Sequence, residues 1–286
     1  MRQVGIVGSA GKMGSWFTGY FARRGLDVSA YDINQKTLKT SGNVKVEDSL
    51  HDCVKDADLV LVSVPLLMTP PAIKECTKNM KDGAIIAEIS SVKNKTFAAL
   101  KKVPSNLRPL CIHPMFGPGA SQKIRAKVLL VPVRNEETEL KIANEIFENA
   151  AVTVLPNGKQ HDRAMAIVLG LTYFTNIVFA KVMISSGNIS MLKQVSGTTF
   201  SLQSLIAEGI FTDEPDLIIA LIQENLYTKK YINQYLNEAG AVARLALAKN
   251  RTDLMADMQE IKSRLEKSQD LQEAYKRMYD IIENSK

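Results

Sequence analysis

Short apolar runs alternate with helical patterns in the first half of the chain. The runs are rich in Val, Ile and Leu, which is typical of buried strands. Between them, residues 12–24 and 136–150 favour helix, and Gly25 follows the first of these where glycine commonly ends a helix. Strands that alternate with helices predict βαβ units in a parallel sheet. The predicted strands are 3–7, 28–31, 44–46, 59–64, 84–89, 110–113, 128–132 and 153–155.

The pattern changes after residues 156–158, beyond which only helical periodicity is found. We therefore predict an α/β protein with a parallel-sheet domain over residues 1–156 and an all-helical C-terminal domain over residues 157–286. Residues 164–180 carry no charged side chain over 17 positions. A membrane-spanning helix needs about 20 apolar residues, so we expect a helix buried in the core or in a subunit interface. An apolar surface of this size predicts a homodimer through the helical domain.

Composition and charge narrow the class of partner. The 286 residues are 45% hydrophobic and 23% charged, and the net charge of +6 is spread along the chain. Nucleic-acid binding favours a concentrated basic face, so a small anionic substrate or cofactor is the better explanation. Three scattered cysteines and three histidines, without a CxxC spacing, predict neither disulfides nor a metal site. The N-terminus lacks a signal-peptide pattern, and we expect a cytoplasmic protein that binds neither nucleic acid nor membrane.

Three glycines follow the first predicted strand and open the first predicted helix. Glycines at such a turn let the backbone approach a pyrophosphate, and the helix N-terminus supplies free N–H groups. The spacing GxxGxxG has one residue more than the commonest form, but its position between a strand and a helix strengthens the prediction. It indicates a Rossmann-type dinucleotide-binding domain whose phosphate-binding residues are Gly8, Ser9, Ala10, Gly11, Lys12, Met13 and Gly14.

Asp32 ends the second predicted strand, 18 positions after Gly14. An acidic residue at this place accepts hydrogen bonds from the adenosine ribose and repels a 2′-phosphate. We therefore predict NAD as the cofactor. Arg24 and Lys36 are close enough in sequence to leave NADP open.

Four further stretches go beyond a generic dinucleotide fold. Taken together and in this order, they resemble the prephenate dehydrogenase family over nearly the whole chain, and the run from Cys111 to Pro118 is the most specific. The four are Ser63-Val64-Pro65, Ser90-Ser91-Val92-Lys93, Cys111-Ile112-His113-Pro114-Met115-Phe116-Gly117-Pro118 and His161-Asp162.

The resemblance implies oxidation of prephenate, or of its amino counterpart arogenate, in tyrosine biosynthesis. In this family hydride passes from ring carbon 4 to a nicotinamide, carbon dioxide leaves and the ring becomes aromatic, giving 4-hydroxyphenylpyruvate or tyrosine. The family's catalytic histidine matches His113, which would accept the proton of the 4-hydroxyl. A neutral imidazole with an ordinary pKa of about 6.5 suits that role. The family's active-site serine matches Ser91, which would hydrogen-bond the same hydroxyl or orient the histidine.

The other matched residues are expected around the same site. Lys93 would hold a substrate carboxylate or face solvent. His161 would line the site or belong to a helix start with Asp162 near the helix dipole. Substrate binding is also expected of Ser90, and cofactor binding of Ser63, Val64 and Pro65.

One departure from the family pattern concerns the substrate. Similar family members bind a substrate carboxylate with an arginine of the helical domain, but no arginine occurs here between Arg163 and Arg244, and the family's second histidine is replaced near Tyr173. Lys193, Gln194, Arg244 or a partner-subunit residue are candidate substitutes. Two alternatives stay open: a 3-hydroxyacid dehydrogenase or imine reductase that uses Lys181 or Lys193, and a non-catalytic nucleotide-binding paralogue.

Overall fold

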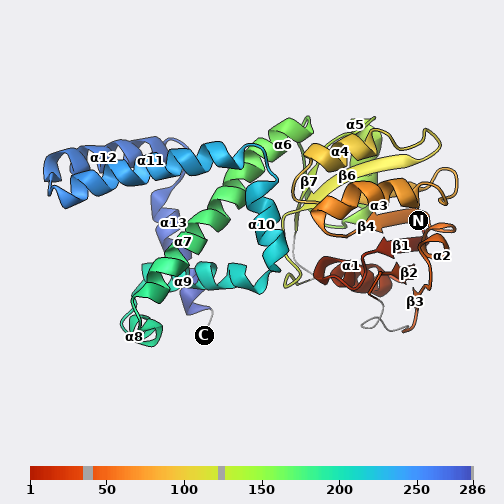
Figure 1. Ribbon diagram of the computed structural model, residues 1–286, viewed down its shortest axis with the longest axis horizontal. Helices are drawn as coiled ribbons and strands as arrows, with labels where there is room; N and C mark the ends of the chain where they lie inside the picture. Colours follow the sequence, from red (N-terminus) through yellow and green to blue (C-terminus); the bar gives the residue numbers. More distant parts are fainter. Residues whose placement is uncertain (35–40, 122–125, 285–286) are drawn as a thin grey trace. The chain divides into compact units, whose positions relative to one another are not determined.

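A single sheet organises the N-terminal part of the chain (Figure 1). The computed structural model describes residues 1–34, 41–121 and 126–284, so Lys36 lies outside the described residues. Within them the sheet has eight strands in the order β3-β2-β1-β4-β5-β6-β7-β8. The strands are β1 Gln3–Val7, β2 Asp27–Tyr31, β3 Val44–Val46, β4 Leu59–Val62, β5 Ile85–Glu88, β6 Arg108–Pro114, β7 Lys127–Leu130 and β8 Ala151–Val154.

One strand pair departs from the predicted parallel arrangement. β6 and β7 are antiparallel, with His113 opposite Leu129, whereas the other neighbouring pairs are parallel. A parallel pair needs a crossover connection, usually a helix, whereas antiparallel strands can be joined directly. The described residues between β6 and β7 contain no helix, so the chain returns beside β6 in the opposite direction.

Helices connect the remaining strands wherever the connection is fully described, and α6 follows the last strand. Two of them begin at side-chain caps: Ser49 accepts from the Asp52 N–H, and Asn135 from the Thr138 N–H. Such caps satisfy N–H groups that the first helical turn leaves unpaired. In this unit they are α1 Lys12–Arg23, α2 Leu50–Val54, the short 3-10 helix η2 Leu66–Met68, α3 Thr69–Cys76, α4 Asn94–Leu100, α5 Glu136–Ile146 and α6 Gly158–Met165.

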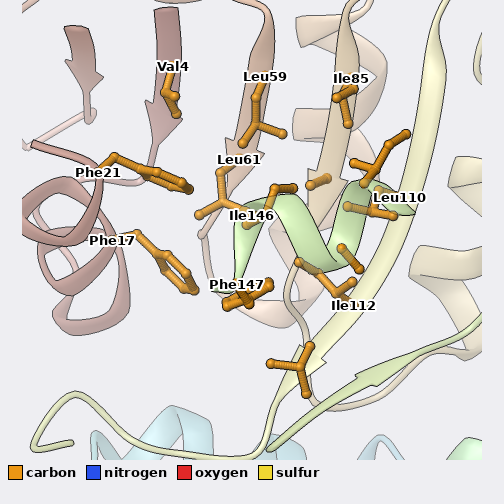
Figure 2. Packing of buried hydrophobic residues seen from close by; sticks show 14 of the residues in the cluster. Val4, Phe17, Phe21, Leu59, Leu61, Ile85, Leu110, Ile112, Ile146 and Phe147 are labelled. Carbon is orange, nitrogen blue, oxygen red and sulfur yellow. The ribbon is translucent and has the colours of Figure 1, made fainter. Parts of the chain in front are cut away.

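Two hydrophobic clusters cover the two faces of the sheet. Side chains alternate between the faces of a strand. In β4, accordingly, Leu59 and Leu61 join one cluster and Val60 and Val62 the other. The first cluster includes side chains of α1 and α5, as Figure 2 shows for Phe17 and its neighbours. The second includes side chains of α2, α3 and α4. The sheet is therefore buried on both faces, and its strand ends are the places left for a ligand.

The described residues of the C-terminal part form helices joined by short turns, with no strand. This part forms a second compact unit, Ala166–Lys286, and the first unit is Met1–Met165. The predicted fold class is thus confirmed, but the division between units follows α6 instead of preceding it at 156/157. The elements are the π-helical η3 Ala166–Leu171, α7 Thr172–Ser185, α8 Ile189–Gln194, α9 Thr198–Gly209, the 3-10 helix η4 Ile210–Thr212, α10 Pro215–Gln223, α11 Thr228–Leu247, α12 Arg251–Glu266 and α13 Leu271–Glu283.

The uncharged segment is helical and only partly buried, with Ile167, Val168 and Val178 44%, 48% and 39% exposed. In α7 only Asn176, Ala180 and Met183 are buried, while Val182 is 65% and Ile184 61% exposed. The helix Gly158–Ser185 has the length and apolar composition of a membrane span, and 22% of its most apolar window is buried within the chain. The prediction offered the core of the chain or a subunit interface, and the chain's own core covers this helix only in part.

Candidate active site

The candidate catalytic residues lie at the carboxyl edge of the sheet. His113 is the penultimate residue of β6, and Ser90 and Ser91 follow β5. β5 and β6 are parallel neighbours with Glu88 opposite Cys111, so both strands end at the same edge. His113 is 4% exposed, and Ser91 is partly buried. Among the described residues the Ser91 side chain makes no hydrogen bond, so its predicted contact with His113 stays a prediction.

A chain of polar contacts leads inward from His113. Its Nδ1 lies 3.0 Å from His161 Nε2, and His161 Nδ1 lies 2.8 Å from Asp162 Oδ1. His161 is completely buried and Asp162 is 3% exposed. His161 therefore contacts the base candidate directly, which supports a place in the site.

Asp162 also binds the start of α4. The Lys93 N–H donates to its Oδ1 at 2.8 Å, and the Asn94 N–H to its Oδ2 at 2.9 Å. These N–H groups have no partner within the helix, and a carboxylate suits the positive end of the helix dipole. The carboxylate thereby ties α6 to α4 and sets the position of the His161 ring.

Lys93 lies in neither of its two expected positions. Its side chain is 0% exposed, and its Nζ donates at 2.6 Å to both Glu88 Oε1 and the Ile112 carbonyl oxygen. The ammonium is therefore a buried counter-ion of Glu88 and not a solvent-exposed group. In this conformation it is not available to bind a substrate carboxylate. Glu88 also accepts from the Ser90 N–H at 2.9 Å and the Cys111 thiol at 3.1 Å.

The environment keeps His113 uncharged. Burial lowers its pKa well below the usual 6.5, and the Lys93 ammonium and His161 lower it further. The pKa of His161 is also lowered, mainly by burial, although Asp162 opposes the shift. An imidazole must be neutral to accept a proton, so His113 is ready to act as a base at neutral pH, and as a weaker base than an exposed histidine.

The glycine loop is closely packed against neighbouring backbone. Gly8 has φ +89°, and a Cβ there would lie 2.4 Å from the Ser63 carbonyl oxygen. A Cβ on Gly14 would lie 2.0 Å from the Gly8 carbonyl oxygen. The Ser9 hydroxyl is buried without a hydrogen-bond partner in the described structure. The N-cap of α1 is Gly11, which offers no side-chain cap. The loop thus offers a pyrophosphate three things: backbone without side chains at Gly8 and Gly14, the unpaired Ser9 hydroxyl, and the uncapped N-terminus of α1.

Asp32 lies beside this loop. Its Oδ2 accepts from the Ala10 N–H at 3.0 Å, and its Oδ1 from the Asn34 N–H at 2.8 Å. Arg24 instead donates to the carbonyl oxygen of Ile146, the last residue of α5, at 2.7 Å and pairs with Glu148, which follows that helix. Of Asp32 and Arg24, therefore, it is the Asp32 carboxylate that lies next to the glycine loop.

Two segments support the loop from either side. After β4, the Ser63 N–H donates to the Val7 carbonyl oxygen at 2.8 Å, which holds Ser63, Val64 and Pro65 next to Gly8. After β6, the Phe116 ring packs on Trp16 of α1 with centroids 4.8 Å apart, and the Trp16 indole N–H donates to the Ala120 carbonyl oxygen at 2.9 Å. The segment that follows His113 is thereby fixed to the helix that begins at the glycine loop.

Family models match most of the chain. The model for the prephenate dehydrogenase nucleotide-binding domain matches residues 18–170, and the one for the prephenate dehydrogenase dimerization domain matches residues 157–260. The chain belongs to the prephenate dehydrogenase family. This confirms the resemblance and makes the protein a member of a dehydrogenase family. The first match begins after the glycine loop, so the evidence for that loop is its own geometry.

Curated relatives are distant and longer. A probable arogenate/prephenate dehydrogenase of Methanocaldococcus jannaschii is 25% identical over 90% of this chain and 59% of its own length. The T-protein of Haemophilus influenzae is 24% identical over 84% of this chain and 61% of its own length. The chain thus spans about three-fifths of the length of these relatives.

Solved structures share the fold. Prephenate dehydrogenase from A. aeolicus, in complex with hydroxyphenyl propionate and NAD+, has a TM-score of 0.74 at 20% identity and covers 94% of this chain and 99% of its own. Arogenate dehydrogenase of Synechocystis has a TM-score of 0.66 at 18% identity and covers 93% of this chain and 99% of its own. At these identities the likeness shows the architecture alone.

The helical unit of this family member carries its own polar pairs. The Tyr173 hydroxyl, near the place where the family has its second histidine, donates to Asp213 Oδ2 at 2.7 Å. Lys193, a candidate for binding a carboxylate, pairs with Glu208 at 2.8 Å. Residues 200–205 of α9 include no arginine.

Sequence reasoning missed the groups behind the site. Glu88 and the contacts of Asp162 were not predicted. A signal for Glu88 was available, because it is the single charged residue in the apolar run 84–89, and a charge in a buried strand requires a partner.

The buried ion pair makes a testable prediction. Lys93→Met removes the ammonium but leaves the Glu88 carboxylate buried, and breaking such a pair costs about 3–5 kcal/mol. We expect the free energy of unfolding, measured with urea, to fall by that order. Lys78→Met is the matched control, because Lys78 pairs with Glu75 at the surface, where ion pairs contribute little. Equal losses in the two variants would contradict a structural role for the Glu88–Lys93 pair.

Proposed function

We propose that the protein oxidises prephenate or arogenate with a nicotinamide cofactor and releases carbon dioxide, as in tyrosine biosynthesis. The observation that carries the proposal is the position of His113, buried and neutral at the edge of the sheet that also bears the glycine loop. β1, β4, β5 and β6 run in the same direction, so Gly8 after β1 and His113 in β6 lie at one edge. Ligands of open α/β sheets bind at this edge, where the strand order reverses between β1 and β4.

His113 would accept the proton of the substrate's 4-hydroxyl as ring carbon 4 becomes carbonyl-like. Its Nδ1 is engaged with His161, so Nε2 is the ring nitrogen available to the substrate. Ser91, at the end of the adjacent strand, would hydrogen-bond the same hydroxyl. A bound nicotinamide would accept the hydride from ring carbon 4, and loss of the carboxylate as carbon dioxide leaves the ring aromatic.

NAD is the cofactor that the loop favours. The glycine loop would hold the pyrophosphate, with the Ser9 hydroxyl and the first N–H groups of α1 as donors. Asp32 adjoins the loop through the Ala10 N–H, and its charge would accept the ribose hydroxyls and repel a 2′-phosphate.

A second copy of this chain would cover the exposed apolar side chains of the helical unit. The match to a dimerization domain over residues 157–260 supports this, and so do the exposed Val182 and Ile184 of α7. Surfaces of this kind mark interaction sites. We expect a homodimer in sedimentation experiments at micromolar concentration, and a monomer under those conditions would contradict the proposal.

One assay tests the reaction. Turnover of prephenate, arogenate and short hydroxyacids is followed by the absorbance of the reduced nicotinamide. The assay is run with NAD and with NADP. We expect oxidation of prephenate or arogenate with a higher kcat/KM for NAD than for NADP. Turnover of hydroxyacids alone would favour the hydroxyacid dehydrogenase alternative. Cofactor binding without turnover of any substrate would favour a non-catalytic protein, which the missing helical-domain arginine makes the main competitor.

His113→Asn tests the catalytic role. Asparagine keeps polarity at the site but cannot accept a proton, and general acid–base catalysis contributes about 10²–10⁴ in rate. We expect kcat to fall at least about 10²-fold while the Kd for NAD stays near wild type. His51→Asn is the matched control, because His51 is exposed on α2, and it should leave kcat unchanged. Near-normal kcat in a folded His113→Asn variant would end the catalytic role.

The pH profile gives an independent check. Because the folded-state pKa of His113 is below 6.5, His113 stays neutral down to below pH 6.5, and kcat/KM should decline only there. The unfolded chain binds the proton first on acidification, so stability should also decline as the pH falls below about 6.5. An acidic limb at or above pH 7 would contradict this environment.

A further inference from the structure

We propose that His161 and Asp162 act as positioning residues that fix the tautomer of His113, with the proton on Nδ1 and the lone pair on Nε2. The geometric part of the proposal concerns three side chains in contact, from β6 and α6. Its consequence for catalysis rests on the proposed function.

The assignment starts at Asp162, whose two carboxylate oxygens both accept hydrogen bonds. Its two oxygens accept the Lys93 and Asn94 N–H groups at 2.8 and 2.9 Å, at the N-terminus of α4. Both oxygens thus act as acceptors, as those of an ionised carboxylate do. An ionised carboxylate is an acceptor only. The 2.8 Å contact between Asp162 Oδ1 and His161 Nδ1 therefore places a proton on His161 Nδ1.

The proton on His161 decides the state of its neighbour. A neutral imidazole has one donor and one acceptor nitrogen, so His161 Nε2 is an acceptor. It lies 3.0 Å from His113 Nδ1, which must then be the donor. His113 Nε2 is left as the bare nitrogen, with no hydrogen-bond partner among the described residues.

Burial and the Lys93 ammonium favour this neutral arrangement. A doubly protonated His161 would donate to His113 Nδ1 and move the His113 proton to Nε2. His161 is completely buried, and Lys93 disfavours a positive charge on it, while Asp162 and Glu88 favour one. Glu88 is already neutralised by Lys93 at 2.6 Å. Burial and the ammonium thus keep His161 singly protonated.

The arrangement prepares His113 to accept a proton and also stabilises the ring after the proton has been transferred. When Nε2 of His113 takes a proton from a substrate hydroxyl, the ring becomes an imidazolium whose Nδ1–H donates to His161. The Asp162 carboxylate, one ring further, stabilises that positive charge. A base with the wrong tautomer cannot accept the proton, and loss of the orienting carboxylate in serine proteases lowers kcat by about 10⁴.

Nitrogen-15 NMR of the protein labelled at its histidine rings reads the tautomers directly. The chain has three histidines, and the His51→Asn variant assigns the exposed one. The spectra are recorded at a pH about one unit above the ordinary histidine pKa of about 6.5. There we expect His113 and His161 both to carry a proton on Nδ1 and none on Nε2. A His113 signal with the proton on Nε2 would overturn the proposal.

Two variants of His161 separate positioning from packing. His161→Gln keeps a carbonyl oxygen that can accept from His113 Nδ1, whereas His161→Met has a similar length and no such acceptor. We expect the Gln variant to keep the Nδ1–H tautomer with kcat within about tenfold of wild type. The Met variant should show a mixed tautomer and a kcat about 10² lower, within the range of acid–base effects. Equal tautomers and equal kcat values in the two variants would overturn the proposal.

The NMR measurement keeps this inference separate from the function. If no substrate is turned over, the proposed reaction fails, and the tautomer signals still decide the geometry. If turnover is normal but His113 carries its proton on Nε2, the tautomer proposal fails and the proposed reaction stands.

Discussion

The ion pair between Glu88 and Lys93 holds the candidate site together. Both side chains are 0% exposed, and placing two charges in the interior is costly unless further hydrogen bonds satisfy them. Here the Lys93 ammonium also donates to the Ile112 carbonyl oxygen, and the Glu88 carboxylate also accepts from the Ser90 N–H and the Cys111 thiol. The pair thus joins the end of β5, the start of α4 and the end of β6, which are the segments that carry Ser91 and His113.

The same ion pair links stability to chemistry. Because Lys93 is fixed, its backbone N–H is available to Asp162, and Asp162 in turn holds the His161 ring against His113. The ammonium also contributes to the lowered pKa of His113. One buried cation therefore supports both the geometry and the neutral state of the candidate base, so a change at Lys93 acts on both.

The helical unit differs in kind from this closely connected centre. Its apolar side chains remain largely uncovered within one chain, as Val182 and Ile184 show. Its polar residues pair with one another, as in Tyr173 with Asp213 and Lys193 with Glu208. The unit has no arginine between Arg163 and Arg244, so the polar side chains that it offers are of other kinds.

The sequence by itself determined the features that local rules govern. Strand positions followed from short apolar runs, with ends shifted by a few residues, and the glycine loop followed from a turn in which Gly8 and Gly14 leave no space for a side chain. The resemblance supplied His113, Ser91 and the family. Only the tertiary structure decided the antiparallel return of β7, the internal place of Lys93, and the contact of Asp162 with backbone 68 and 69 positions away. Such contacts have no periodic or local signature, because they arise when distant segments meet in a buried environment where each charge must find a partner.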